Sequence, residues 1–102
     1  MIVTALINEM ENNTGAAKQA AVNALGRIQL KTATEPLMKQ LKLWLTIPLL
    51  AADIVRALGD IGDNRAVDIL VIMLEKHGSE AVRSQAATAL GKIRGDKRLA
   101  AL

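Results

Sequence analysis

The chain has 102 residues, enough for a single domain that removes roughly two-thirds of its unfolded surface from water on folding. Apolar residues make up 51% of it, and a formal net charge of +3 is too small to indicate a nucleic-acid partner unless the basic residues cluster. Cysteine is absent, which excludes disulfides and thiolate metal sites, and no segment has the pattern of a secretory signal or a membrane span. We therefore expect a cytoplasmic protein with no membrane partner.

The N-terminal part of the chain predicts two helices. Residues 2–12 carry apolar side chains at helical spacing, namely Val3, Leu6, Ile7 and Met10. A second helix is expected over residues 15–30, in which apolar residues recur at intervals of three and four. This helix contains the sequence Ala24-Leu25-Gly26-Arg27-Ile28, which returns twice later in the chain.

The returning sequence defines a repeat. It reads Ala57-Leu58-Gly59-Asp60-Ile61 in the second copy and Ala89-Leu90-Gly91-Lys92-Ile93 in the third, with the leucines 33 and 32 residues apart. A period of this length, in a chain with almost no strand pattern, is typical of stacked helix pairs. Equivalent first helices are expected over residues 47–61 and 80–94. The predicted fold is all-α, a right-handed α–α superhelix of about three repeats.

Each copy has a glycine near the end of its helix, at Gly26, Gly59 and Gly91. Glycine inside a helix costs about 1 kcal/mol relative to alanine, so its return at one position indicates a steric reason. We predict that a neighbouring helix crosses at each glycine too closely for a Cβ atom.

Second helices are expected over residues 33–41 and 66–74, which align with each other. Thr32 followed by Glu35 fits a capping box at the start of the first of them, and Asp63 is a candidate N-cap for the second. After the third copy, residues 97–102 are expected to begin a further second helix.

This pattern makes residues 1–102 a single domain of consecutive repeats. Its expected parts are the second helix of a partial repeat (1–14), repeat one (15–46), repeat two (47–78) and an incomplete repeat three (79–102). Natural arrays end in repeats with a polar outer face, which this sequence lacks. We therefore expect a piece of a longer array, or ends that a partner or a second copy covers.

The connection between repeats one and two is unusually apolar. It reads Leu43-Trp44-Leu45-Thr46-Ile47-Pro48-Leu49-Leu50 and contains the only aromatic residue of the chain, Trp44. Tryptophan is enriched in interface hot spots, and exposed apolar clusters mark contact surfaces. Two interpretations stay open: Trp44 binds a partner, or it fills the seam between the two repeats.

Several segments together resemble a known family of repeats. The sequence Val82-Arg83-Ser84-Gln85-Ala86-Ala87-Thr88-Ala89-Leu90-Gly91-Lys92-Ile93 resembles the first helix of HEAT-like repeats of the phycobilisome-lyase type. Residues 57–67 resemble the middle of that repeat, and Thr34-Glu35-Pro36-Leu37-Met38 its second helix. The resemblance covers nearly the whole chain and is weakest over residues 1–14 and 41–50. It implies a curved solenoid that binds other proteins, and it brings no catalytic motif.

The resemblance also implies that the second helices line the concave face on which such solenoids bind. Aligned positions form three rows: Thr4, Glu35 and Asp68; Asn8, Lys39 and Ile72; and Glu11, Lys42 and Glu75. Their mixed chemistry suits a protein surface better than a phosphate backbone, although an ordinary solvated face would look the same. The candidate protein-binding residues are Asn8, Glu35, Lys39, Lys42, Trp44, Asp68, Ile72 and Glu75.

The other chemical groups form no reactive pattern. Basic residues gather near the end of the third repeat: Lys92, Arg94, Lys97 and Arg98. The second repeat has Asp60 and Asp63 in that region, so no continuous basic surface is expected. His77 is the only histidine and has no second histidine or cysteine to complete a metal site. No grouping of nucleophile, base and acid occurs.

These observations predict a non-enzymatic scaffold that binds another protein and uses no catalytic residue, cofactor or metal. Two alternatives are kept. One is a subunit or fragment of a bilin lyase or another assembly that handles phycobiliprotein chromophores, which only the resemblance implies. The other is a nucleic-acid-binding helical repeat, for which the basic residues are too few. The uncapped ends of the stack also predict self-association into a homo-oligomer.

Overall fold

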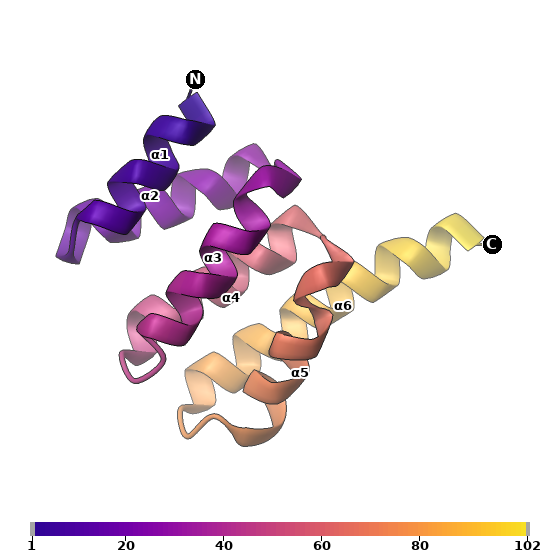
Figure 1. Cartoon of the computed structure of the whole chain (residues 1–102). Helices are drawn as coiled ribbons and strands as arrows, with labels where there is room; N and C mark the ends of the chain where they lie inside the picture. Colours follow the sequence, from indigo (N-terminus) through magenta and orange to yellow (C-terminus); the bar gives the residue numbers. More distant parts are fainter. Residues whose placement is uncertain (1, 102) are drawn as a thin grey trace.

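The computed structural model describes residues 2–101, with the side chains of residues 2–94, and this part of the chain is helical without any strand. Figure 1 shows the helices following one another as a staggered series of antiparallel pairs from the N-terminus to α6. The α-helices are α1 (Ile2–Asn12), α2 (Gly15–Ile28), α3 (Thr34–Leu43), α4 (Pro48–Ile61), α5 (Val67–Lys76) and α6 (Glu80–Ala101). Short 3₁₀ turns, η1 (Lys31–Ala33) and η2 (Asn64–Ala66), precede α3 and α5.

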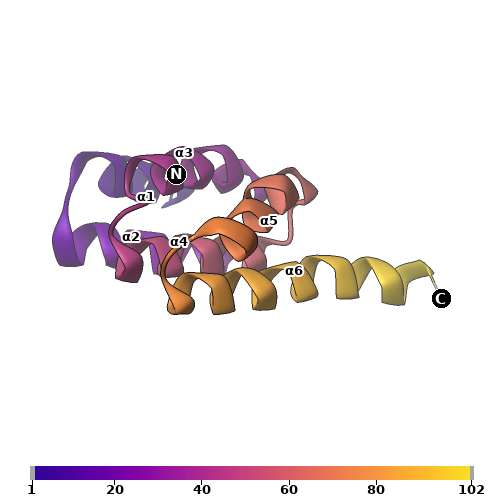
Figure 2. The same ribbon diagram turned by 90° about the horizontal axis from the view of Figure 1, so that it is seen from below.

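The helices form two layers, which are seen edge-on in Figure 2. The first helices of the repeats, α2, α4 and α6, lie side by side in one layer, and α4 contacts both of the others. The second helices, α1, α3 and α5, form the other layer, and each packs on the first helix that follows it. The prediction of an all-α helical-repeat solenoid is therefore confirmed.

The centre of the core is α4, because it lies between two first helices and under α3. Most of its residues are buried, and Val55 and Leu58 are fully enclosed. Equivalent apolar positions of α2, including Val22 and Leu25, join the same cluster. The buried side chains are small and aliphatic, which lets the helices of this layer approach one another closely.

Two of the three repeated glycines have the predicted steric role. A Cβ atom on Gly59 would lie 2.6 Å from the Cβ and 2.7 Å from the Cα of Ala89, and one on Gly26 would lie 3.0 Å from the Cα of Ala57. The prediction is wrong for Gly91, where an added Cβ would meet no described atom within 4 Å. The reason is positional, since Gly91 lies on the face of α6 turned away from α4.

The connections between first and second helices are short and closed by backbone hydrogen bonds. Gly62 ends α4 in the left-handed conformation at φ 76°, and its N–H donates to the Leu58 carbonyl at 3.1 Å. Asp63 accepts a hydrogen bond from the Arg65 N–H at 3.0 Å, so it caps η2, the turn that leads into α5. Gln29 takes the same left-handed conformation at φ 62° at the end of α2.

The predicted capping box at Thr32 and Glu35 is wrong. The chain enters α3 through η1, whose turn is closed by a backbone bond from the Ala33 N–H to the Leu30 carbonyl at 3.1 Å. Ala33 then takes the N-cap position of α3, and no side chain caps that helix. Burial of Ala33 against the core fixes this turn in place of a side-chain cap.

The predicted second helix over residues 97–102 is also wrong, because α6 continues without interruption to Ala101. The second helices α3 and α5 each pack on the first helix of the following repeat. Each residue that extends an existing helix gains a backbone hydrogen bond without a new nucleation cost, and α6 is extended in this way to Ala101. The helix thus tolerates Gly95, whose cost is about 1 kcal/mol.

Candidate functional site

The most unusual surface of the molecule is the turn between α3 and α4, residues 43–49, which we name the Trp44 turn. Four of its large apolar side chains are more than a third exposed to solvent: Leu43, Leu45, Ile47 and Leu49. The most exposed of them is Leu49, at 68%. Pro48 begins α4 in this segment, as its fixed φ allows. A contiguous apolar surface of this kind is typical of a contact site.

Trp44 itself is half-buried and held in a fixed orientation. Its indole N–H donates to the Gln40 side-chain oxygen at 3.1 Å. The Lys18 ammonium lies 5.1 Å from the ring centroid, within the range of a cation–π interaction. Trp44 therefore packs against Lys18 of α2 and Gln40 of α3 within repeat one, and it also lines a cavity.

Lys18 is a buried cation at the base of this arrangement, only 2% exposed. Its ammonium donates to the Met10 carbonyl and to the Gln40 side-chain oxygen, which are both neutral acceptors. Burial lowers the pKa of the Lys18 amine, and the negative charge of Glu11 opposes this shift. The positive charge of Lys18 is thus stabilised by the oxygens of Met10 and Gln40 and by the indole ring of Trp44. Lys18 forms no ion pair among the described side chains.

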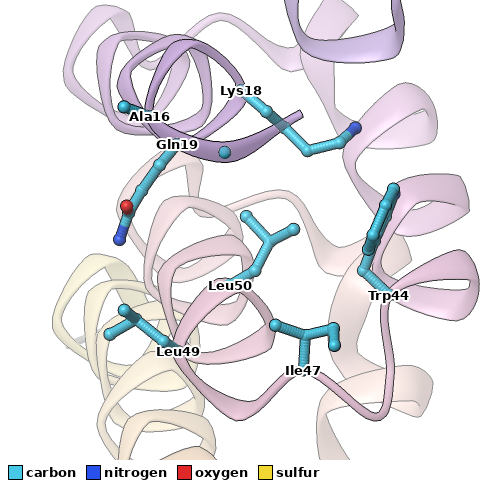
Figure 3. A pocket seen from close by; sticks show the side chains of 8 residues that line it. Ala16, Lys18, Gln19, Trp44, Ile47, Leu49 and Leu50 are labelled. Carbon is cyan, nitrogen blue, oxygen red and sulfur yellow. The ribbon is translucent and has the colours of Figure 1, made fainter. Parts of the chain in front are cut away.

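A first cavity, of about 320 Å³, opens beside Trp44 at the N-termini of α2 and α4. Figure 3 shows Trp44 and Leu50 on opposite sides of it, with Ile47 below and the Lys18 side chain along the top. Its lining residues are Gly15, Ala16, Lys18, Gln19, Trp44, Ile47, Leu49 and Leu50. The lining is mostly apolar, and Lys18 is its only charged residue.

A second cavity, of about 310 Å³, lies on the other side of the Trp44 turn, against the end of α5. It is lined by Leu45, Thr46, Ile72, Met73, Lys76, His77 and Gly78. The ring of His77 closes one wall: its Nδ1 accepts the Ser79 N–H at 3.0 Å, so its Nε2 carries the proton and donates to the Leu45 carbonyl at 2.8 Å. The ring thus links the Trp44 turn to Ser79, the residue before α6.

Polar side chains also link α2 to α4 beside the first cavity, which Gln19 lines. The buried Asp53 of α4 accepts from the Gln19 side chain at 2.6 Å and pairs with Arg56 at 2.9 Å. Arg56 donates in turn to the Asn23 side chain of α2 at 2.5 Å. These hydrogen bonds join α2 to α4 at two points along the helices.

An ion pair at Lys92 further weakens the case that the predicted basic cluster binds nucleic acid. Lys92 forms an ion pair with Asp60 of the preceding repeat at 2.5 Å, so its charge is locally neutralised. The side chains of Lys97 and Arg98 lie outside the described residues. Among residues 2–94, the pairing of Lys92 with Asp60 therefore gives the nucleic-acid alternative no added support.

The predicted second-helix residues are all exposed, on α1, α3 and α5: Asn8, Glu35, Lys39, Lys42, Asp68, Ile72 and Glu75. They do not form one cluster, because the second helices contact one another little and pack mainly on first helices. Glu35 is engaged with Arg65 at 3.6 Å. Ile72 alone among these residues lines a cavity, while Trp44 lines the other.

Sequence reasoning missed two residues that shape the site, Lys18 and Gln40. A signal for Lys18 was present, because it lies three, four and seven residues before Ala21, Val22 and Leu25, on the buried face of α2. Gln40 similarly precedes Leu41 on the buried face of α3. A polar residue in an apolar stripe indicates a buried partner, here the indole of Trp44.

Two further chemical properties of residues 2–94 bear on the site. Their side chains contain no cluster of three or more groups arranged to hold a metal ion. Among the helices described, none has the length and apolar character needed to cross a membrane.

Comparison with known proteins agrees with the helical-repeat architecture. A family model described as HEAT repeats matches residues 3–76 and, in a second overlapping match, residues 48–102. A search of curated proteins found no match. Because the two matches together cover almost the whole chain, and because the two-layer stack has the arrangement expected of such repeats, this chain belongs to the HEAT-repeat family.

Proposed function

We propose that this chain is a non-enzymatic scaffold that binds another protein through the Trp44 turn and the exposed side chains of the second helices beside it. HEAT repeats generally mediate protein–protein interactions, which supports the class of function. The residues that make the contact are our own assignment.

The observation that carries the proposal is the exposed apolar Trp44 turn between two cavities. Burying one large aliphatic side chain contributes about 1.5–3 kcal/mol, so covering even Leu43 and Leu49 would supply a substantial part of a binding energy. The turn is also pre-organised, because the Trp44–Gln40 and His77–Leu45 hydrogen bonds hold it in place. Such pre-organisation reduces the entropy cost of binding.

The chemistry of the charged groups also favours binding over catalysis. Among the described side chains, the acidic and basic groups closest to one another form links within the scaffold, such as Asp63 with Arg65 and Asp53 with Arg56. The charged residues predicted on the second helices are exposed, and the buried Lys18 is bonded to neutral acceptors. This arrangement supports recognition of a surface rather than proton or group transfer.

A capture experiment with the purified chain as bait tests the proposal. Cross-linked partners are identified by mass spectrometry with the wild type, with Leu43→Glu and Leu49→Glu on the Trp44 turn, and with Lys39→Glu and Ile72→Glu on the second helices. We expect one specific partner to be lost with the turn variants, and circular dichroism checks that each variant is folded. Capture that none of the four substitutions changes would contradict the proposal.

Narrower predictions from the sequence accompany this proposal. Membership of the phycobilisome-lyase type of repeat predicts a change in visible absorbance when the protein is mixed with bilin and apo-phycobiliprotein, and an unchanged spectrum would count against it. Self-association through the ends of the stack predicts species larger than a monomer in light scattering. A cytoplasmic location is tested by cell fractionation.

A further inference from the structure

We infer that the segment that docks on the Trp44 turn is an acidic amphipathic peptide of the partner protein, which places apolar side chains in both cavities. This inference rests on the proposed function, because it specifies the chemistry of the protein segment that the scaffold binds.

The two cavities are positioned to receive one continuous segment. They lie on opposite sides of the same turn: Trp44 and Ile47 line the first, while Leu45 and Thr46 line the second. The exposed Leu49 also lines the first cavity, and the exposed Leu43 directly precedes Trp44 in the chain. A peptide that lies across the Trp44 turn would therefore contact its apolar side chains and could enter both cavities.

The size and lining of the hollows favour bulky apolar anchors. Their volumes of about 320 and 310 Å³ are at the low end of the range of ligand pockets, roughly 300–1,000 Å³, so each suits one or two side chains. Leu, Met or aromatic side chains match walls made by Trp44, Leu50 and Met73. Anchors spaced along one face of a helix would reach both hollows, as in helix-in-groove recognition.

The positive charge at the cavities favours acidic amphipathic peptides over neutral or basic ones. None of the residues that line either cavity is acidic, and the charged ones are Lys18 and Lys76. Lys42 adds an exposed cation in the last turn of α3, directly before the Trp44 turn. A segment with glutamate or aspartate between its apolar anchors therefore meets the exposed cations Lys42 and Lys76, while the buried Lys18 adds positive charge behind the wall of the first cavity.

The backbone beside the first cavity also favours an acidic segment. Gly15 and Ala16 come from the first turn of α2, and Leu49 and Leu50 from that of α4. Neither first turn contains an acidic residue, and neither N-cap makes a side-chain hydrogen bond. The partial positive charge of both helix N-termini is thus uncompensated next to the cavity, in addition to the charge of Lys18.

Trp44 is the only tryptophan, so its fluorescence reports directly on the first cavity. The probes are three synthetic amphipathic peptides with the same leucine pattern, whose polar positions are glutamate, lysine or glutamine. We expect the glutamate peptide to shift the emission at the lowest concentration. Added salt should weaken this binding, because exposed charge pairs are screened.

A matched pair of variants tests occupancy of the cavity. Ala16 is exposed and lines the first cavity, so Ala16→Leu should fill it without disturbing the core and should abolish the emission shift. Ala20→Leu adds the same side chain to an exposed position one turn later on α2, outside the cavity, and should leave binding unchanged.

A second set tests the charges. Reversal of both rim lysines, Lys42→Glu with Lys76→Glu, should weaken the glutamate peptide roughly threefold to tenfold and strengthen the lysine peptide. Arg27→Glu with Lys31→Glu is the control, because it makes the same double charge reversal at exposed positions outside both cavities.

Several outcomes would overturn the inference. Equal binding of the lysine or glutamine peptide would remove the acidic preference, although protein binding itself would stand. An emission shift with decanoate but with no peptide would identify a small apolar acid as the occupant. A shift on raising the protein concentration alone would identify a second copy. If no probe shifts the emission while the capture experiment still yields a partner, the site is wrong and the proposed function survives.

Discussion

Asp63 shows how one buried carboxylate stabilises the connection between two helices. It is 6% exposed, accepts the Arg65 N–H at the start of η2, and pairs with the Arg65 guanidinium at 2.7 Å. These hydrogen bonds lower the pKa of Asp63 from 3.8 to about 2, and its desolvation opposes them. Arg65 also donates to the Lys31 carbonyl, so the same guanidinium joins the connections of repeats one and two.

The lowered pKa predicts how stability depends on pH. The folded protein holds the Asp63 carboxylate ionised to lower pH than the unfolded chain does, so its contribution is complete above pH 3.8 and is lost as the pH falls towards 2. Asp63→Asn should remove about 1 to 2 kcal/mol of unfolding free energy at neutral pH and flatten its fall between pH 4 and 2.

Urea unfolding at a series of pH values measures this effect. Asp68→Asn is the matched control, because it changes the same functional group at an exposed position on α5. A wild-type curve and an Asp63→Asn curve that stay parallel below pH 4 would contradict the assignment.

At the scale of helices, the packing of α2, α4 and α6 depends on glycine–alanine contacts. A Cβ on Gly26 or Gly59 would lie 3.0 or 2.7 Å from the Cα of Ala57 or Ala89, so these helices cross at backbone contact. Gly91 occupies the third equivalent position but faces open space. Three glycines that are identical in the sequence pattern therefore have different roles in the stack.

Alanine substitution at these glycines should give effects of opposite sign. Gly59→Ala forces a Cβ against backbone atoms and should destabilise the protein by about 1 to 3 kcal/mol. Gly91→Ala meets no described neighbour, so the gain in helix propensity should stabilise it by up to about 1 kcal/mol. Denaturant midpoints compare the two variants with the wild type. Equal effects at both positions would show that the close crossing does not matter energetically.

At the scale of the whole molecule, the stack is a linear series in which central helices have more neighbours than terminal ones. Leu58 of α4 is fully buried, while the equivalent Leu90 of α6 is half-buried, because α6 is packed only on one side within its layer. Stability in such arrays is close to a sum of repeat and interface contributions.

This arrangement predicts a graded response to leucine truncation. Leu58→Ala should cost about 3 to 5 kcal/mol, since the cavity it leaves is enclosed on all sides. Leu90→Ala should cost about 1 to 2 kcal/mol, because solvent already reaches that side chain. Calorimetric unfolding of both variants checks the order, and a larger loss for Leu90→Ala would contradict a core centred on α4.

Most of the fold could be predicted from the sequence because it rests on local patterns. The repeated Ala-Leu-Gly phrase and its apolar spacing gave the first helices, with ends within about two residues of those observed in repeats one and two. The apolar Trp44 turn was equally visible as an anomaly in composition. These features follow from neighbours in the chain, which a single sequence records.

The rest depends on contacts between distant residues. Only the packed structure shows that Lys18 lies under Trp44, that Gly91 lacks the neighbour that Gly59 has, and that two hollows flank one turn. It also decided that α6 continues past Gly95, where the sequence pattern predicted a turn. The sequence by itself determined a stack of paired helices, since helical periodicity is local. The tertiary structure decided the site, since cavities and buried charges are properties of the side chains that surround a position.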